Sequence, residues 1–374
     1  MDIGIIGSGI AGLTLANLLQ DTQSQGFKVT IYDQAKVLKP VGAGFTLQPN
    51  GLSIMKKIGV YDEIIKRSAK VDNSVIHDTY GNKLPTDIMR TLSSDRESYS
   101  IHRGDFQEIL LKNLSQFVNI QLNHEFISAR NIDDKVEITF GNGRTWTHDL
   151  LIGADGVRSQ VRRVISPETK LEAERVTAIR ALIPKCEATT GGSNFRAWIG
   201  GNKVLVTYPV KDSQKINIAA YVPSNNKQYK GWSQAVSKHT LLEEFKGWGF
   251  EAINLMNHVE YAFSWELYDH LPLSSWSEGA ICVIGDAAHA MLPYLGQGAN
   301  QAIEDCGVLA SLLTDITSKN EIEGVLKDYE SIRKESVTMI QSLSRQAGHV
   351  FRDDFGGDIG KKAKEINKLL GQRS

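Results

Sequence analysis

Three glycine-rich segments, each following a short apolar run, are the parts of this sequence best suited to chemistry. The first, Gly7-Ser-Gly-Ile-Ala-Gly12, stands between an apolar run at 2–6 and a segment with helical spacing at 10–19. Glycines at Gly7, Gly9 and Gly12 permit a tight turn and let the backbone approach a pyrophosphate at the positive end of a helix. Asp33 follows a second strand, predicted at 28–32 from alternating apolar and polar residues, and lies 21 residues after Gly12, where its carboxylate can accept hydrogen bonds from a ribose. These residues predict a βαβ unit that binds a dinucleotide; a glycine turn without a ligand is the less favoured alternative.

The segment Val283–Asp305 indicates which dinucleotide this is. Gly285 and Asp286 end an apolar strand, where a carboxylate can bind a polyol. Gly296-Gln-Gly298 then opens a helix, and its apolar positions share one face: Ala302, Cys306, Leu309, Ala310 and Leu313. The free N–H groups at the start of a helix stabilise negative charge, and reduced flavin carries such charge on one edge of its ring. The segment Leu151–Ser159, with Asp155 and Gly156 after a third strand, completes a set of turns that predicts a flavin site.

The elements that must position these turns form two domains, because 374 residues exceed the size of one ordinary core. Alternation of apolar and polar residues from Val118 to Leu151, with a turn at 141–143, predicts an antiparallel sheet. Further short strands are expected at 176–183, 195–200, 203–209 and 215–222. Helices are expected at 51–58, with Asn50 as the N-cap, and at 60–68, 105–114 and 239–247. A long final helix is expected at 321–349 and would cross the first domain.

The fold class predicted is therefore α/β: a Rossmann-like FAD-binding domain, an inserted, mostly antiparallel β-sheet domain for the substrate, and C-terminal helices. The boundaries that we predict are 1–75, 101–175 and 270–374 for the FAD-binding domain and 76–100 and 176–269 for the substrate domain.

Composition excludes several other classes of protein. The 42 basic and 43 acidic residues give a net charge of -1, which provides no global attraction for nucleic acid. Three cysteines without C-x-x-C spacing argue against a disulfide framework and a structural zinc site, and no other metal-ligand spacing is apparent. We find neither a signal peptide nor an apolar run long enough to span a membrane, so a cytoplasmic protein, monomeric or homodimeric, is expected.

The ordered motifs resemble those of the single-component FAD-dependent aromatic hydroxylases, and most closely the salicylate hydroxylase branch. The resemblance runs from residue 1 to about 350 and rests on the first glycine motif, on Gly153-Ala-Asp-Gly156 with Arg158 and Ser159, and on Gly285-Asp-Ala-Ala-His289 with Pro293 and Gly296-Gln-Gly298. Pro40–Asn50, Ile101–Asp105 and Thr207–Val210 agree with it. Two departures are Gln34, where many members have arginine, and the lack of the extra C-terminal domain of phenol hydroxylase relatives.

The resemblance implies a role for each motif residue. Asp33 would hold the adenosine ribose, Arg103 the ribityl and pyrophosphate region, Asp286 the ribityl chain, and Asp155 the pyrophosphate and the transient nicotinamide cofactor. The cofactor-binding set that we predict is Gly7, Gly9, Ala11, Gly12, Asp33, Gln34, Gly44, Thr46, Arg103, Asp155, Asp286, Gly296, Gln297, Gly298, Ala299 and Asn300.

The chemistry implied by the resemblance is hydroxylation of a small aromatic or heteroaromatic substrate with NADH or NADPH and O2, through a flavin C4a-hydroperoxide. The flavin would perform the oxygen transfer, while the protein positions the substrate and excludes water. We predict Pro293 beside the oxygen site. Arg180 either clamps a carboxylate or phenolate or faces solvent, and Tyr208 either lines the pocket or belongs to the core with a satisfied hydroxyl.

Two alternatives to this function remain open at this point. One is a flavin monooxygenase that acts on a larger scaffold such as a quinolone, a polyketide or a tetracycline-like compound. The other is a flavin-bound redox sensor without turnover. His289 and His102 are tempting as general bases, but a structural hydrogen bond is the favoured interpretation of both.

Overall fold

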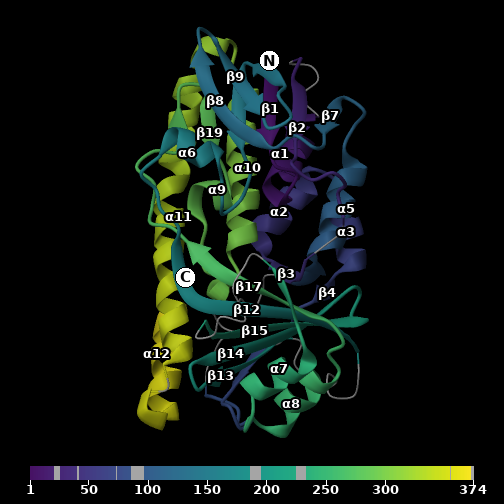
Figure 1. Cartoon of the computed structure of the whole chain (residues 1–374), viewed down its shortest axis with the longest axis vertical. Helices are drawn as coiled ribbons and strands as arrows, with labels where there is room; N and C mark the ends of the chain where they lie inside the picture. The colour runs from purple at the N-terminus through teal and green to yellow at the C-terminus, as the bar shows by residue number, and fades with distance from the viewer. Residues whose placement is uncertain are drawn as a thin grey trace.

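The computed structural model describes residues 1–20, 26–39, 42–72, 74–85, 97–185, 195–224, 233–353 and 355–371. Its upper half in Figure 1 contains a six-stranded sheet of order β18-β19-β11-β1-β2-β7, in which every pair but β18 with β19 is parallel. The bounds of these strands are β1 Asp2–Ile6, β2 Lys28–Tyr32, β7 Val118–Gln121, β11 Leu150–Gly153, β18 Ser277–Glu278 and β19 Ile281–Val283.

Helices cover the central strands of this sheet, which explains why β11 and β19 are apolar throughout. All four residues of β11 and all three of β19 are buried, as expected for strands with both faces covered. The helices of this half are α1 Ile10–Gln20, α2 Pro49–Lys57, α3 Tyr61–Arg67, α5 Arg103–Asn113, α6 Val161–Ile165, α9 Asp286–His289 and α10 Gly298–Thr314.

The lower half of Figure 1 is built on a seven-stranded sheet of order β16-β17-β12-β15-β14-β13-β5, antiparallel except for the pair β13 with β5. Its strands are β5 Ser74–His77, β12 Glu172–Pro184, β13 Phe195–Gly200, β14 Lys203–Val210, β15 Lys215–Pro223, β16 Gln234–Val236 and β17 Ala262–Asp269. Helices α7 Lys238–Glu244 and α8 Phe250–Asn257 lie on one face of this sheet (Figure 1). The domain boundaries given above stay a prediction; β5 begins two residues before the predicted boundary at 76.

Two small sheets and the C-terminal helices complete the fold. One small sheet is β8 Phe126–Ile132, β9 Lys135–Phe140 and β10 Thr145–His148; the other is β3 Gly44–Leu47, β4 Ala69–Lys70 and β6 Tyr99–His102. Helix α11 (Ile322–Arg352) runs along both halves, followed by α12 (Ile359–Gly371), as the yellow ribbons of Figure 1 show; short 3-10 turns lie at Pro293–Leu295 (η4), Lys319–Glu321 (η5) and Phe355–Gly357 (η6). None of the described helices combines the length and apolarity needed to cross a bilayer.

The structure confirms the predicted fold class and corrects two details. The predicted antiparallel span is too long at both ends, because Val118 begins β7 and Leu151 lies in β11, and both strands pair in parallel within the large sheet. Asn50 is not an N-cap: α2 begins at Pro49 after Gln48, because proline is already set for the first helical position. The long C-terminal helix is confirmed, and it contacts both halves of the molecule.

Candidate active site

The three glycine turns meet at the carboxyl edge of the parallel sheet, because β1, β11 and β19 are neighbouring strands. A Cβ added to Gly7 would lie 2.5 Å from the carbonyl oxygen of Ala154, so only glycine allows these two turns to touch. A Cβ on Gly285 would lie 2.9 Å from that of Ala302 in α10, and Gly285 has a left-handed φ of 59°. The turn that carries Asp286 is thereby pressed against the helix beside it.

Asp33 holds the first glycine turn together. One oxygen of its carboxylate accepts hydrogen bonds from the backbone N–H and the hydroxyl of Ser8 at 2.8 and 2.5 Å, and the other accepts from the N–H of Ala35 at 2.8 Å. Gln34 is exposed beside it. The predicted contact of Asp33 with a ribose remains a prediction, but its position next to the start of α1 agrees with that role.

Arg103 lies between the first and third turns. It begins α5, and its guanidinium is 4.0 Å from the point that a Cβ on Gly9 would occupy. Burial lowers the pKa of Arg103, while Asp286 and Asp33 oppose that shift and keep the side chain a cation. A cation between two turns whose helices present free N–H groups makes this edge of the sheet attractive to an anion such as pyrophosphate.

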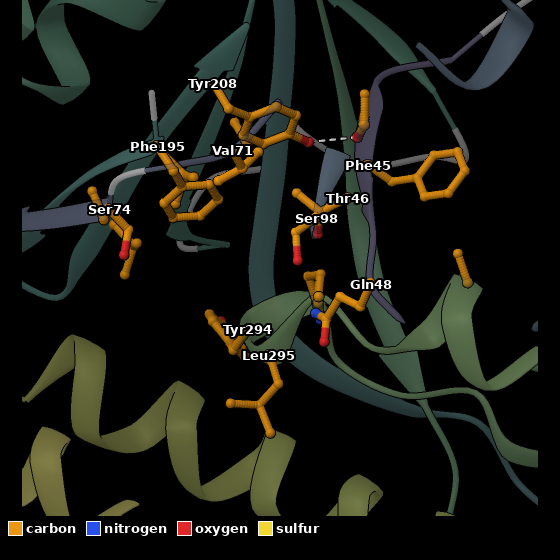
Figure 2. A pocket seen from close by; sticks show the side chains of 18 of the residues that line it. Phe45, Thr46, Gln48, Val71, Ser74, Ser98, Phe195, Tyr208, Tyr294 and Leu295 are labelled. Carbon is orange, nitrogen blue, oxygen red and sulfur yellow. Dashed lines mark hydrogen bonds between the residues drawn. The ribbon is translucent and has the colours of Figure 1, made fainter. Parts of the chain in front are cut away.

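A cavity of about 640 Å³ opens between this edge and the antiparallel sheet. In Figure 2 the side chains of Tyr208 and Phe195 lie on one side of it, and those of Tyr294 and Leu295 on the other. The rings of Tyr208 and Phe195 are parallel, with centroids 5.6 Å apart. The residues that we predicted from the sequence and that line the cavity are Gly44, Thr46, Arg180, Tyr208, Asp286, Pro293, Gly296, Gly298 and Ala299.

Asp286 faces the cavity from the third turn. Its side chain is exposed although protein surrounds it, because the exposure is to the cavity. This surrounding protein raises the pKa of Asp286, and His289 and Arg103 oppose the rise. Gly298 at the start of α10 lies beside it: a Cβ added there would make ordinary contacts with Cγ of Met291 at 3.7 Å and with Oδ1 of Asp286 at 3.8 Å. A hydroxyl-bearing chain and an electron-rich edge of a ring fit these two groups.

Arg180 enters the cavity from β12 and does not face solvent. Its Nη2 donates to the hydroxyl of Tyr221 at 2.8 Å, and the guanidinium lies 5.2 Å from the centre of that ring. Among the described residues, no carboxylate forms an ion pair with Arg180. The cavity therefore contains a cation whose protein partners are neutral phenols.

Tyr208 lines the cavity, and its hydroxyl also has a hydrogen-bond partner within the protein. Both alternatives given for it from the sequence, a pocket residue and a core residue with a satisfied hydroxyl, are therefore true at once. Its hydroxyl donates to the carbonyl oxygen of Gly44 at 2.5 Å, and the N–H of Gly44 donates to Asn217 at 2.9 Å. Burial raises the pKa of Tyr208 well above its usual value, with Arg180 opposing the rise. Tyr208 therefore has a fixed orientation on one side of the cavity, and its hydrogen bond to Gly44 links β3 to the antiparallel sheet.

Three predicted residues use their polar groups within the protein. Asp155 lies outside the cavity lining, and its carboxylate accepts from the hydroxyl of Ser159 and from two N–H groups at the start of α6; a contact with a pyrophosphate or a nicotinamide stays a prediction. His289 hydrogen-bonds Asp305 at 2.5 Å, and His102 hydrogen-bonds the carbonyl of Gly42 at 3.0 Å. The structural interpretation of both histidines is confirmed.

The site fits FAD. At Gly9 and at Gly298 an added Cβ would make only ordinary contacts, with no neighbour closer than 3.7 Å, whereas at Gly7 and Gly12 it would overlap backbone atoms. The two positions without overlap leave room for close approach by a ligand, and the two with overlap require glycine for the packing of strand on helix. Together with the cation Arg103 and the carboxylate Asp286, the donor set suits a pyrophosphate joined to a polyol and a flat ring.

Comparison with known proteins agrees with this geometry. A family described as FAD binding domain matches residues 1–344. The 3-amino-4-hydroxybenzoate 2-monooxygenase PtmB3 of Streptomyces platensis is 29% identical over 357 residues, which cover 93% of this chain and 88% of that protein. The chain belongs to the FAD-binding monooxygenase family and is a FAD-dependent monooxygenase of its aromatic hydroxylase group. The second alternative given above, a flavin-bound redox sensor without turnover, is not consistent with a place in this family of enzymes.

Solved structures share the whole fold. The substrate complex of a salicylate hydroxylase superposes with a TM-score of 0.84 at 23% identity and covers 100% of this chain and 97% of its own. Klebsiella pneumoniae HpxO complexed with FAD and uric acid gives a TM-score of 0.83 at 20% identity, with 100% and 96% of the two chains covered. The order of sheets and helices described above is therefore that of known FAD-binding enzymes.

Several residues at the site or behind it were not predicted from the sequence. Asn217, which accepts a hydrogen bond from the N–H of Gly44, belonged to no motif, and Tyr294, which lines the cavity, lay within the segment Val283–Asp305 without an assigned role. Arg333 had a signal that was overlooked: it is a charged residue on the buried face of α11, four residues from Tyr329 and from Val337, both of which are buried. A buried charge on an apolar stripe requires a partner, and that requirement points to a polar network.

Proposed function

We propose that this protein hydroxylates a small aromatic or heteroaromatic compound that carries an anionic substituent, with O2 and either NADH or NADPH as co-substrates. The observation that supports this substrate class is Arg180, a cavity-lining cation whose hydrogen-bond partners among the described residues are the neutral phenols of Tyr221 and Tyr208. A carboxylate or phenolate on the substrate would complete its coordination with charge-assisted hydrogen bonds.

The site residues take the following roles in this proposal. The turn Gly7–Gly12 with Arg103 receives the pyrophosphate, Asp33 the adenosine ribose, and Asp286 the ribityl chain. The N–H groups of Gly298, Ala299 and Asn300 would face the ring at the start of α10, where Gly296, Gly44 and Thr46 line the cavity and Gln297 is buried beside them. When bound, FAD supplies the redox chemistry, taking reducing equivalents from NAD(P)H and activating O2.

The chain itself positions the substrate and keeps water away from it. The parallel rings of Tyr208 and Phe195 give the cavity a flat apolar side suited to an aromatic ring. Because the hydroxyl of Tyr208 donates to Gly44, its proton is already engaged, and Tyr208 orients the substrate ring without exchanging a proton with it. Pro293, in the 3-10 turn before α10, lies on the cavity wall next to the N–H groups of that helix, which stabilise negative charge developing there.

The test is a panel of matched aromatic pairs, each an acid and its methyl ester, offered to the purified holoenzyme. We expect the acid of one pair to accelerate NAD(P)H oxidation and to yield a product with one added oxygen atom from ¹⁸O2. Running each assay with NADH and NADPH identifies the preferred donor. Equal stimulation by acid and ester would refute the anionic class, and stimulation confined to quinolone, polyketide or tetracycline-like compounds would favour the larger-scaffold alternative.

The variant Arg180→Met sharpens this test, because methionine has a similar length and no charge. Charge-assisted hydrogen bonds contribute about 1.5–3 kcal/mol, so we expect KM for the acid to rise roughly 10- to 100-fold. KM for the ester should change little. An unchanged KM for the acid would show that Arg180 does not bind the substrate.

A further inference from the structure

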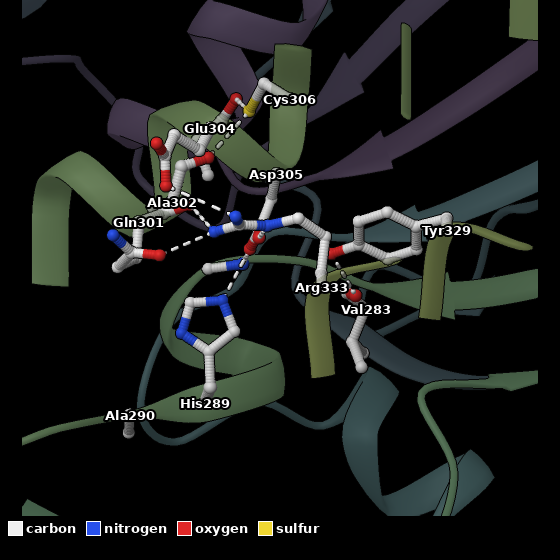
Figure 3. Close-up of polar contacts among 12 residues, drawn as sticks. Val283, His289, Ala290, Gln301, Ala302, Glu304, Asp305, Cys306, Tyr329 and Arg333 are labelled. Carbon is white, nitrogen blue, oxygen red and sulfur yellow. Dashed lines mark hydrogen bonds and ion pairs between the residues drawn. The ribbon is translucent and has the colours of Figure 1, made fainter. Parts of the chain in front are cut away.

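A buried cation, Arg333 of α11, lies behind the active site and not in it. It is 7% exposed, and its guanidinium donates in three directions, which Figure 3 shows. Nε donates to Asp305 at 2.8 Å, Nη1 lies 3.2 Å from Glu304, and Nη2 donates to the side-chain oxygen of Gln301 at 2.6 Å. A guanidinium has donors only, so each of these neighbours must present an oxygen to it.

Asp305 keeps this cation in place. It is fully buried, and the oxygen that does not bond Arg333 accepts from the N–H of Gly285 at 2.9 Å and from Nε2 of His289 at 2.5 Å. Burial alone would raise the pKa of Asp305, but His289 and Arg333 hold it below its usual value. The carboxylate is therefore ionised at neutral pH, and Arg333 has no freedom to turn away from Gln301.

A chain of three side-chain amides leads from Arg333 to the cavity. The oxygen of Gln301 faces Arg333, so its NH2 group points the other way and donates to the oxygen of Gln297 at 3.0 Å. The NH2 group of Gln297 donates in turn to the oxygen of Gln48 at 2.5 Å. Each amide accepts at one end and donates at the other, and the direction of the whole chain follows from the cation at its origin.

The last amide of this chain belongs to the cavity wall. Gln48 lines the same cavity as Gly298 and Ala299 at the start of α10, and Figure 2 shows its side chain there. Its backbone is held by the N–H that it donates to Asn300 at 2.9 Å. Since the oxygen of its side chain is engaged by Gln297, the group that remains for a ligand is the NH2.

We propose that Arg333 is a positioning residue that orients this amide chain so that Gln48 presents an N–H donor to the flavin in the cavity. The inference depends on FAD binding and not on the identity of the aromatic substrate. Without Arg333, the amides lose the neighbour that admits only an oxygen, and each can rotate by half a turn. Gln48 would then present its oxygen to the cavity in part of the molecules.

The expected consequence concerns the reduced form of the flavin. A donor stabilises the negative charge of reduced flavin more than it stabilises the neutral oxidised ring. Loss of this donor should weaken the preference for the reduced form about tenfold, which for a two-electron couple is about 30 mV in midpoint potential. A residue that serves only the stability of the fold would not move this potential.

The experiment measures the midpoint potential of the bound flavin, the Kd for FAD and thermal stability in a set of variants. Gln48→Leu removes the donor, Arg333→Met releases the chain, and Arg333→Lys keeps a cation with donors only. The matched control is Arg345→Met. Arg345 is on the same helix as Arg333 but away from the amide chain, and the substitution breaks its 2.6 Å ion pair with Asp269 of β17.

We expect Q48L to lower the midpoint potential by about 30 mV, R333M to lower it in the same direction by a smaller amount, and R333K and R345M to keep it near that of the unaltered protein. If R333M fails to fold or to bind FAD, Gln301→Leu interrupts the chain while Arg333 keeps its ion pair with Asp305, and a shift in the same direction as that expected for R333M should be measured. The proposal is overturned if Q48L leaves the potential unchanged, or if R333M and Q301L reduce stability but not the potential.

Discussion

Gly44 lies where strand β3 crosses the antiparallel sheet, and its replacement by alanine is the sharpest steric test of the site. A Cβ at this position would lie 2.8 Å from Cε2 of Tyr208 and 2.8 Å from Cγ1 of Val210. Carbon atoms in contact are normally about 3.5–4.0 Å apart, so one methyl group would overlap two neighbours. Both neighbours are buried, and Tyr208 is also held by its hydrogen bond to the Gly44 carbonyl.

The size of the effect follows from these contacts. Overpacking of a well-packed site costs about 1–3 kcal/mol, and loss of the Tyr208 hydrogen bond adds about 0.5–1.5 kcal/mol. We therefore expect Gly44→Ala to reduce the free energy of unfolding by about 2–4 kcal/mol. The φ of Gly44 is not in the left-handed region, so the backbone contributes nothing to this cost. Because Tyr208 must move, KM for the aromatic substrate should rise as well.

The measurement is denaturant unfolding of the holoenzyme, with steady-state kinetics on the same preparations. The control is Gly324→Ala in α11, where an added Cβ meets nothing within 4 Å. Alanine is the better helix former there and should stabilise the protein by about 0.5–1 kcal/mol. The two substitutions are chemically identical and should act with opposite sign. If Gly44→Ala proves as stable as Gly324→Ala and keeps its KM, the contact between β3 and Tyr208 is not as described.

Three further predictions address the cofactor site and pH. Asp286→Ala should release FAD, because the cavity then lacks the carboxylate that faces the ribityl position; purified protein that stays yellow and active would contradict the assignment. Gly298→Leu should abolish FAD binding, because the leucine side chain would fill the space at the start of α10, and it should leave the stability of the apoprotein unchanged. Calorimetry with and without FAD measures the FAD affinity and the stability. Tight FAD binding by this variant would argue against the placement of the ring. Burial lowers the pKa of His270 to about 4, so below about pH 6.5 the unfolded chain takes up a proton that the folded protein does not, and stability should fall by roughly 3 kcal/mol between pH 6.5 and 4. His270→Gln should flatten this slope in denaturant titrations, and an equal slope in both proteins would assign the acid sensitivity to other groups.

The predictions from sequence succeeded where the signal is local. Glycines and a carboxylate directly after an apolar strand identify a turn at the edge of a parallel sheet, and the three such turns do lie on neighbouring strands. The long helix near the end of the chain was equally visible from its periodicity. The Asn50 cap failed because a proline one residue earlier is a stronger local signal for the start of a helix.

Residues whose role depends on distant partners were not predictable in the same way. Arg180 on an alternating strand can face either side, and only the packing of the antiparallel sheet against the nucleotide-binding half turns it into the cavity. Asp155 follows its strand just as Asp286 does, yet its carboxylate is used by Ser159 and α6.

The amino-acid sequence alone determined the class of cofactor and the family, because binding a pyrophosphate and a flavin requires particular residue types at short, fixed spacings. Tertiary structure alone decided which polar groups reach the cavity and in which direction they donate. Gln48 and Arg333 are far apart in the chain, and their relation exists only because α11 packs behind α10 and places a cation at the end of a line of amides.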